Sequence, residues 1–95
     1  LYDKALERLD RAAASLAAGD VPAAIPQMSK TQLIVSELAA GVRLEGNEES
    51  GANVLRLYEY VVNELRQPKP EGIANARKIL ATLREGFEAV RAEAN

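Results

Sequence analysis

Four stretches of apolar residues in this 95-residue chain repeat at three- or four-residue steps, the spacing of one side of an α-helix. Because each helix buries its apolar side against another element, four such stretches predict one all-α domain over residues 1–95, an antiparallel four-helix bundle. We expect helices at about residues 1–18, 21–41, 51–66 and 71–92. The four stripes are Tyr2, Leu6, Leu9, Ala13 and Leu16; Met28, Val35, Leu38 and Val42; Val54, Tyr58, Val61 and Leu65; and Ile73, Ala76, Leu80, Leu83, Phe87 and Val90.

Residues with strong local preferences mark the ends of the first two helices. Gly19 is placed to end the first helix, and Asp20 to cap the start of the second. Pro22 falls in the first turn, where proline is tolerated. Pro26 predicts a kink or an irregular first turn, with a later helix start as the alternative. Leu1 has no capping residue before it, which suggests that a preceding segment was cut away or lost.

The connections differ in length and composition. The polar stretch 42–51 is predicted to be the longest connection and the best candidate for a mobile loop. Residues 67–70, Gln-Pro-Lys-Pro, predict a short and stiff turn, with Pro70 just before or at the start of the fourth helix. Short connections at 19–20 and 67–70 favour antiparallel neighbours.

The chain contains no histidine and no cysteine. This removes the commonest general bases, the soft metal ligands and the Glu-x-x-His motif of di-iron bundles. Glycine motifs that bind phosphate are absent, and the serines have no histidine to activate them. Glu48 and Glu49 could hold a cation weakly or form a solvated charge pair. We therefore expect no enzymatic activity, no catalytic residue, no cofactor and no metal.

The charge pattern excludes further classes of partner. The net charge is −2, with acidic and basic residues interspersed, so the chain lacks the basic face that nucleic acids require. No apolar run approaches the roughly 18 residues of a membrane span, and no signal-peptide pattern opens the chain. A cysteine-free chain fits a reducing compartment. We expect a cytoplasmic protein that neither binds nucleic acid nor inserts into a membrane.

Apolar residues outside the stripes are the candidates for contact with a protein partner. A single exposed apolar side chain needs no explanation, whereas several together mark a binding surface. For Leu33 and Tyr60, chance exposure and partner contact both remain open. Tyr58 lies in the middle of its stripe, so we expect it in the core with its hydroxyl hydrogen-bonded at the bundle edge. The predicted partner-binding residues are Leu33, Ile34, Glu37, Leu57 and Tyr60.

Four segments carry a further resemblance: residues 1–6 (LYDKAL), 30–38 (KTQLIVSEL), 53–60 (NVLRLYEY) and 79–87 (ILATLREGF). In this order they resemble segments of the flagellar export chaperone FliS family, and the likeness covers nearly all of the chain. The chain departs from the family pattern in several places. The family's usual segment before LYD and its glycine pair before the third helix are missing. Phe87 stands where tryptophan is common, and Pro26 interrupts a helix that is normally continuous.

The resemblance implies a cytoplasmic export chaperone without catalytic activity. Its partner would be the C-terminal segment of flagellin, which is disordered before export, and binding would prevent premature filament assembly. A homodimer is left open. The alternative is a helical adaptor or oligomerisation module of unrelated origin, which would self-associate through the exposed sides of Leu33 and Tyr60.

Overall fold

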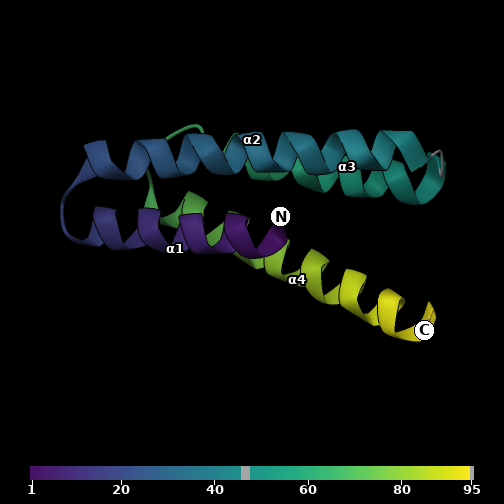
Figure 1. Ribbon diagram of the computed structural model, residues 1–95. Helices are drawn as coiled ribbons and strands as arrows, with labels where there is room; N and C mark the ends of the chain where they lie inside the picture. Colours follow the sequence, from purple (N-terminus) through teal and green to yellow (C-terminus); the bar gives the residue numbers. More distant parts are fainter. Residues whose placement is uncertain (46–47, 95) are drawn as a thin grey trace.

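The computed structural model describes the backbone of residues 1–45 and 48–94, and the side chains of residues 1–42 and 51–87. Its helices are α1 (Tyr2–Ala17), α2 (Val21–Glu45), α3 (Glu48–Glu64) and α4 (Pro70–Ala94). Successive helices run in opposite directions, and each packs against the next, with α4 closing the ring against α1 (Figure 1). The predicted all-α, antiparallel four-helix bundle is confirmed.

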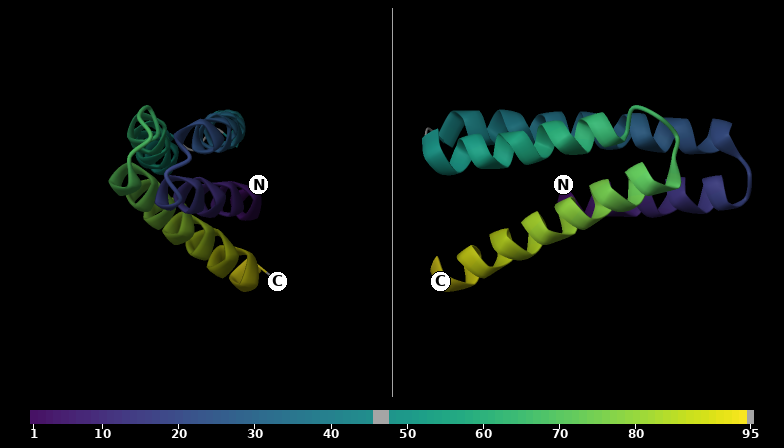
Figure 2. Two further views of the ribbon diagram at one scale, coloured as in Figure 1. Left: turned by 90° about the vertical axis from the view of Figure 1, so that its left-hand side faces the viewer. Right: turned by 180° about the vertical axis from the view of Figure 1, so that it is seen from behind.

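The bundle is elongated, and the separation of α4 from the other helices varies along its length. Its principal dimensions are 43 Å by 23 Å by 17 Å. α2 and α3 lie side by side, and α1 and α4 form the second layer (Figure 1). Both views of Figure 2 show α4 slanting away from the other helices toward its C-terminus. α4 is therefore nearer the other helices at its N-terminal end than at its C-terminal end (Figure 2).

The core follows the predicted stripes, with small residues added to them. Ala13 of the first stripe is exposed, because Ala5 and Ala12 carry the buried side of α1 instead. Phe87 of the fourth stripe is 45% exposed, and the side chain of Val90 lies outside the described residues. The buried apolar residues are Ala5, Leu9 and Ala12 of α1; Ala24, Met28, Val35 and Ala39 of α2; Tyr58, Val61 and Leu65 of α3; and Ile73, Ala76 and Leu80 of α4.

One polar side chain, Thr31 of α2, is fully buried among the described residues. Its hydroxyl donates a hydrogen bond of 2.8 Å to the carbonyl of Gln27, one turn earlier in the same helix. Because this bond satisfies the hydroxyl, threonine occupies a core position without an unpaired donor.

The junction of α1 and α2 is built by two residues, as predicted. Gly19 has a φ of 77°, and its N–H bonds the carbonyl of Leu16 at 3.0 Å. The N–H of Asp20 bonds the carbonyl of Ser15 at 2.8 Å, which completes a Schellman motif. The Oδ1 atom of Asp20 then accepts the N–H of Ala23 at 3.2 Å and caps α2.

α2 runs through Pro26 as one helix. It begins at Val21, so the alternative of a later helix start after Pro26 is wrong. The N-cap at Asp20 and the tolerated position of Pro22 fix the first turn before Pro26 is reached. A kink at Pro26 stays a prediction.

The long mobile loop predicted at 42–51 is wrong. α2 continues to Glu45 and α3 begins at Glu48, so only positions 46 and 47, which lie outside the described residues, separate them. Gly41 lies inside α2, which continues to Glu45, and its φ is not positive. Gly51 is a packing residue rather than a turn residue. A Cβ on it would lie 3.3 Å from Cγ1 of Val42, so glycine allows α3 to approach α2 closely.

The connection between α3 and α4 is short and tightly packed. α4 begins at Pro70, in agreement with the prediction, and proline suits this first helical position because its missing N–H has no partner there. Gly72 follows in the first turn of α4. A Cβ on Gly72 would collide with the carbonyl oxygen of Glu64, so the end of α3 and the start of α4 meet backbone to backbone.

Candidate partner-binding site

A groove of about 610 Å³ lies between α3 and α4. Its walls are mostly apolar or aliphatic, and two cationic side chains border it. Grooves of this kind accept the apolar side of an amphipathic helix. The lining residues are Arg56, Leu57 and Tyr60 of α3, and Asn75, Lys78, Ile79, Thr82 and Leu83 of α4.

Two predicted site residues meet in this groove. Leu57 is 37% exposed and Tyr60 is 42% exposed, although both are large apolar side chains within a regular helix. The carboxylate of Glu64, one turn along α3, interacts with the hydroxyl of Tyr60 and raises the pKa of Tyr60. The polar end of the ring is therefore already satisfied within α3, which leaves the apolar body of the side chain for a partner.

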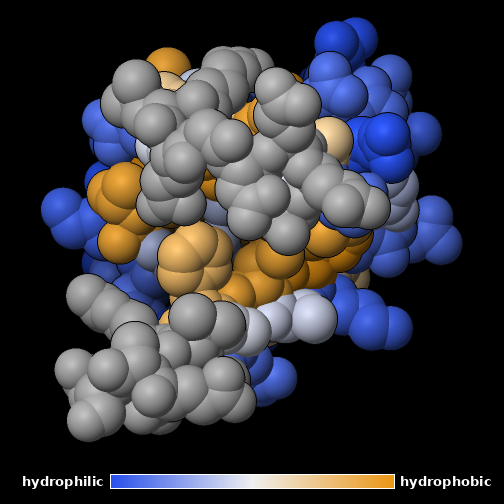
Figure 3. All heavy atoms as spheres, turned by 90° about the vertical axis from the view of Figure 1, so that its right-hand side faces the viewer, coloured by the Kyte–Doolittle hydropathy of each residue, from blue (hydrophilic) through white to orange (hydrophobic). Residues whose placement is uncertain are grey.

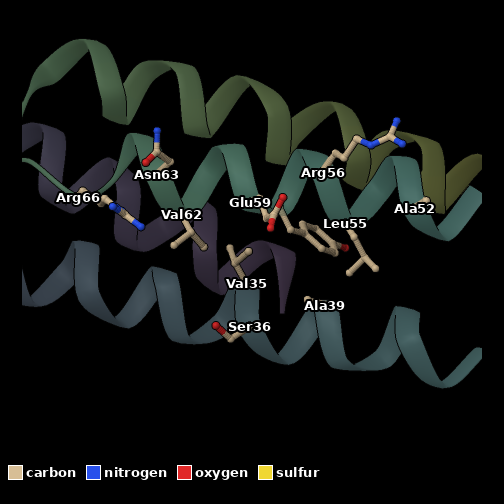
Figure 4. Close-up of a pocket in the computed structure, with 11 residues that line it drawn as sticks. Val35, Ser36, Ala39, Ala52, Leu55, Arg56, Glu59, Val62, Asn63 and Arg66 are labelled. Carbon is tan, nitrogen blue, oxygen red and sulfur yellow. The ribbon is translucent and has the colours of Figure 1, made fainter.

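A second groove, of about 640 Å³, lies on the opposite flank of α3, against α2. Figure 4 shows Val35 of α2 and Val62 of α3 between the two facing helices. Near one end, Nε2 of Gln32 bridges the helices by donating to the carbonyl of Val62 at 3.0 Å. Arg56 lines both grooves. The other lining residues are Ser36, Ala39, Ala52, Leu55, Tyr58, Glu59, Asn63 and Arg66.

The three predicted site residues of α2 lie apart from both grooves. Leu33 is 68% exposed, Glu37 is exposed, and Ile34 is half-buried against the core. None of the three lines either groove. The predicted set therefore divides into a pair in the α3–α4 groove and a group on α2.

Most of the groove wall on α4 is not predicted by the sequence. Leu83 belongs to a predicted core stripe, and no surface is predicted for Ile79. One signal for this wall is present in the sequence. Ile79 and Leu83 are four residues apart, so they form a second apolar strip on the helix, next to the buried strip of Ala76 and Leu80. Nothing in the spacing within one helix, however, indicated that this second strip faces Leu57.

The side of the molecule onto which the N-terminal end of α1 opens exposes another apolar area. Figure 3 shows apolar side chains on this side, between the two regions drawn in grey. Leu1 is 55% exposed, and the ring of Tyr2 packs against Phe87 with 5.8 Å between centroids. The hydroxyls of Tyr2 and Tyr58 are 2.5 Å apart, so the predicted buried position and edge hydrogen bond of Tyr58 are confirmed. Burial, together with this bond, raises the pKa of Tyr2.

The described residues offer no constellation for metal chemistry. No group of three or more Asp, Glu, His or Cys side chains in this part of the chain could hold a metal ion. The side chains of Glu48 and Glu49 lie outside the described residues. Across the same described part of the chain, no helix is long and apolar enough to span a membrane. What the grooves provide is apolar surface and charge, the chemistry of binding.

Comparison with known families gives one result. A family model described as flagellar protein FliS matches residues 1–94. Comparisons with curated proteins and with solved structures gave no match.

Proposed function

The chain belongs to the flagellar protein FliS family, a family of flagellar export chaperones, and from this premise we propose that it binds the C-terminal segment of flagellin. The chaperone holds this disordered segment on its surface and thereby prevents filament assembly before export. Both partners meet in the cytoplasm, where the flagellin chain is made.

The observation that carries the proposal is the pair Leu57 and Tyr60 in the groove between α3 and α4. Two large apolar side chains, 37% and 42% exposed, face a neighbouring wall that contains Ile79 and Leu83. Burying such side chains against a partner stabilises a complex by the same hydrophobic effect that forms a core. An amphipathic helix of the cargo would fill this groove with its own apolar stripe.

The physics of a disordered cargo favours reversible holding. A segment that folds on binding loses conformational freedom, so part of the interaction free energy offsets its ordering. The groove beside α2, with Val35 and Val62 on its walls, gives the same cargo a second contact on the other flank of α3. Contacts on both flanks would spread the binding over several weak sites, from which export can release the cargo.

Calorimetric titration with a peptide of the flagellin C-terminal segment tests the proposal. We expect saturable binding with a negative heat-capacity change, because apolar surface is buried. The double variant Leu57→Ala with Tyr60→Ala should weaken binding by about 2 kcal/mol or more, since centrally placed large residues dominate such interfaces. Titration of the unaltered protein without heat at several temperatures would contradict the proposal.

Ile25→Ala is the matched control for this experiment. Ile25 is 47% exposed on α2 but lines neither groove, so its removal should leave the affinity unchanged. Leu33→Ala tests the remaining prediction, that Leu33, Ile34 and Glu37 of α2 also contact the cargo. A loss of affinity in Leu33→Ala would extend the binding surface to α2, and no loss would confine it to the flanks of α3.

The exposure of Leu33 favours one other candidate, a module that associates with itself. Leu33 is 68% exposed, the largest value among the exposed large apolar residues described. A second copy could cover it, which would give the homodimer that the sequence leaves open. Sedimentation of the protein should then show a dimer that Leu33→Ser abolishes, whereas monomer at all concentrations would exclude this candidate.

A further inference from the structure

Among the described residues, two cations border the α3–α4 groove without a carboxylate partner. Neither Arg56 nor Lys78 forms an ion pair within the part of the chain that the structure describes. Arg56 donates one hydrogen bond of 3.3 Å to the side-chain oxygen of Asn53, which is neutral. No acidic residue lines the groove. The groove therefore combines apolar walls with two border cations that form no ion pair among the described residues.

Two other arginines of α4 are arranged differently. Nε of Arg77 lies 2.7 Å from Asp10, and Nε of Arg84 lies 2.8 Å from Asp3, so two arginines of α4 pair with carboxylates of α1. α4 thus carries paired cations on the side that meets α1 and an unpaired one on the side that meets α3. The lack of an ion pair within the described residues is shared by other cations, among them Lys4, Lys30, Arg66 and Lys69. What distinguishes the two groove cations is that both border exposed apolar surface in one groove.

The two cations also stand at about the same height along the groove. α3 and α4 are antiparallel, and Arg56 and Lys78 are each eleven residues from Gln67 in their connection (67 − 56 and 78 − 67). Since both line the same groove, a carboxylate at the border of a bound helix meets a cation on either wall. Charge complementarity of this kind sets partner specificity and speeds association.

We propose that the α3–α4 groove selects an amphipathic helix that carries acidic residues beside its apolar stripe. The α4 wall from Asn75 to Leu83 is about 12 Å long at the rise of an α-helix, so the bound portion is roughly two to three turns. Its apolar side chains pack on Leu57 and Tyr60, and its carboxylates pair with Arg56 and Lys78. This inference rests on the proposed function, in that the helix belongs to the cargo.

Three synthetic helical peptides test the selectivity without any flagellin sequence. They share one apolar stripe and differ only in the residues that border it, which are Glu, Gln or Lys. Fluorescence anisotropy should show the Glu peptide binding about tenfold more tightly than the Gln peptide at low salt, with the Lys peptide weakest. The preference should shrink as salt is added. Equal affinities for the three peptides would overturn the inference.

Charge-reversal variants test whether the preference for acidic peptides arises in the α3–α4 groove. Lys78→Glu leaves Arg56 beside a new carboxylate, so the net charge of the border falls to zero and the preference for the Glu peptide should disappear. Lys30→Glu makes the same charge change on α2, away from both grooves, and should leave the order unchanged. Circular dichroism checks that each variant keeps its helices and its melting temperature. A folded Lys78→Glu protein with the original preference would contradict the assignment to this groove.

The two proposals fail in distinguishable ways. If the Glu peptide binds in a Lys78-dependent manner and the flagellin segment does not bind, the groove chemistry holds and the cargo identity is wrong. If the flagellin segment binds with the same affinity to the unaltered protein and to Lys78→Glu, the cargo identity holds and the acidic selectivity is wrong.

Discussion

α1 and α3 each lie between two neighbouring helices, yet their flanks are built in different ways. α1 buries two alanines, Ala5 and Ala12, and polar contacts cross both of its flanks. Arg8 donates to Oε1 of Gln27 on α2 at 3.0 Å, and Asp3 and Asp10 pair with arginines of α4. Small residues with paired polar borders close an interface between helices.

α3 shows the opposite arrangement. It buries Tyr58, Val61 and Leu65, but a groove lies along each flank. Leu57 and Tyr60 remain partly exposed beside one groove, and the cations there are unpaired among the described residues. The comparison shows that the flanks of α1 are closed by paired polar contacts, whereas the flanks of α3 leave apolar grooves that a partner can fill. The predictions below test this difference between the two helices.

The same substitution in the two helices should give the largest contrast. Leu9→Ala in α1 removes a fully buried side chain and should lower the free energy of unfolding by about 2–5 kcal/mol. Leu57→Ala in α3 removes a side chain that is already 37% exposed and should cost less than about 1 kcal/mol. Urea unfolding measures both. Equal losses would show that Leu57 belongs to the core and that α3 is as closed as α1.

The meeting point of α3 and α4 should be the next most sensitive position. Gly72→Ala places a Cβ against the carbonyl oxygen of Glu64 and should cost about 1–3 kcal/mol, because one of the two backbones must move. Gly86→Ala in the same helix is the matched control. A Cβ there meets no atom within 4 Å, so the better helix propensity of alanine should stabilise the protein by up to about 1 kcal/mol. Thermal melts that rank the two variants in the reverse order would disprove the close approach.

Tyr2 joins α1 directly to α3 through its hydroxyl, and its loss should have an intermediate effect. Tyr2→Phe removes the hydrogen bond to Tyr58 and should cost about 0.5–1.5 kcal/mol. The pKa of Tyr2 is raised in the folded protein by burial and by this bond, so its contribution is fully present below the ordinary tyrosine pKa of about 10 and is lost as the pH rises above it. The unaltered protein should therefore lose more stability than Tyr2→Phe between neutral pH and strongly alkaline pH. Parallel pH curves for the two proteins would exclude this account.

The ion pairs on the border of α1 should have the smallest effect on stability. Arg77 and Asp10 are about half exposed, so water and salt screen their attraction. Asp10→Asn should change the free energy of unfolding by less than about 1 kcal/mol, and it should leave peptide affinity unchanged because the pair lies away from both grooves. A marked gain in peptide affinity for Asp10→Asn would contradict this prediction, because it would mean that loss of one ion pair exposes a binding surface on α1.

Local sequence signals were sufficient where structure depends on neighbours along the chain. Gly19 and Asp20 predicted the α1–α2 junction, because the left-handed residue and the cap act within one turn. The stripe through Tyr58 and Val61 predicted the buried side of α3. The same reasoning failed at Gly41 and Gly51, which resemble loop residues but lie inside helices. At Gly51 the close approach of Val42 favours glycine within the helix, whereas a Cβ on Gly41 would meet no atom of the described residues within 4 Å.

The candidate site was only half predictable because it depends on how helices face one another. Exposure of Leu57 and Tyr60 followed from their positions on one helix. Their neighbours Ile79 and Lys78 come from α4, and no spacing within a helix fixes the register and slant of the next. Leu33 was correctly placed on an exposed side of α2, yet the distance of that side from the grooves required the packed bundle.

Methyl NMR of the protein during titration with the flagellin C-terminal segment tests the division between α1 and α3 most directly. Leu57, Ile79 and Leu83 line the α3–α4 groove, whereas Leu9 reports on the closed core beneath α1. We predict that the methyl signals of the three groove residues shift as the segment binds, while those of Leu9 stay in place. Shifts centred on α1, with the groove methyl groups unchanged, would contradict the assignment of the binding surface to α3.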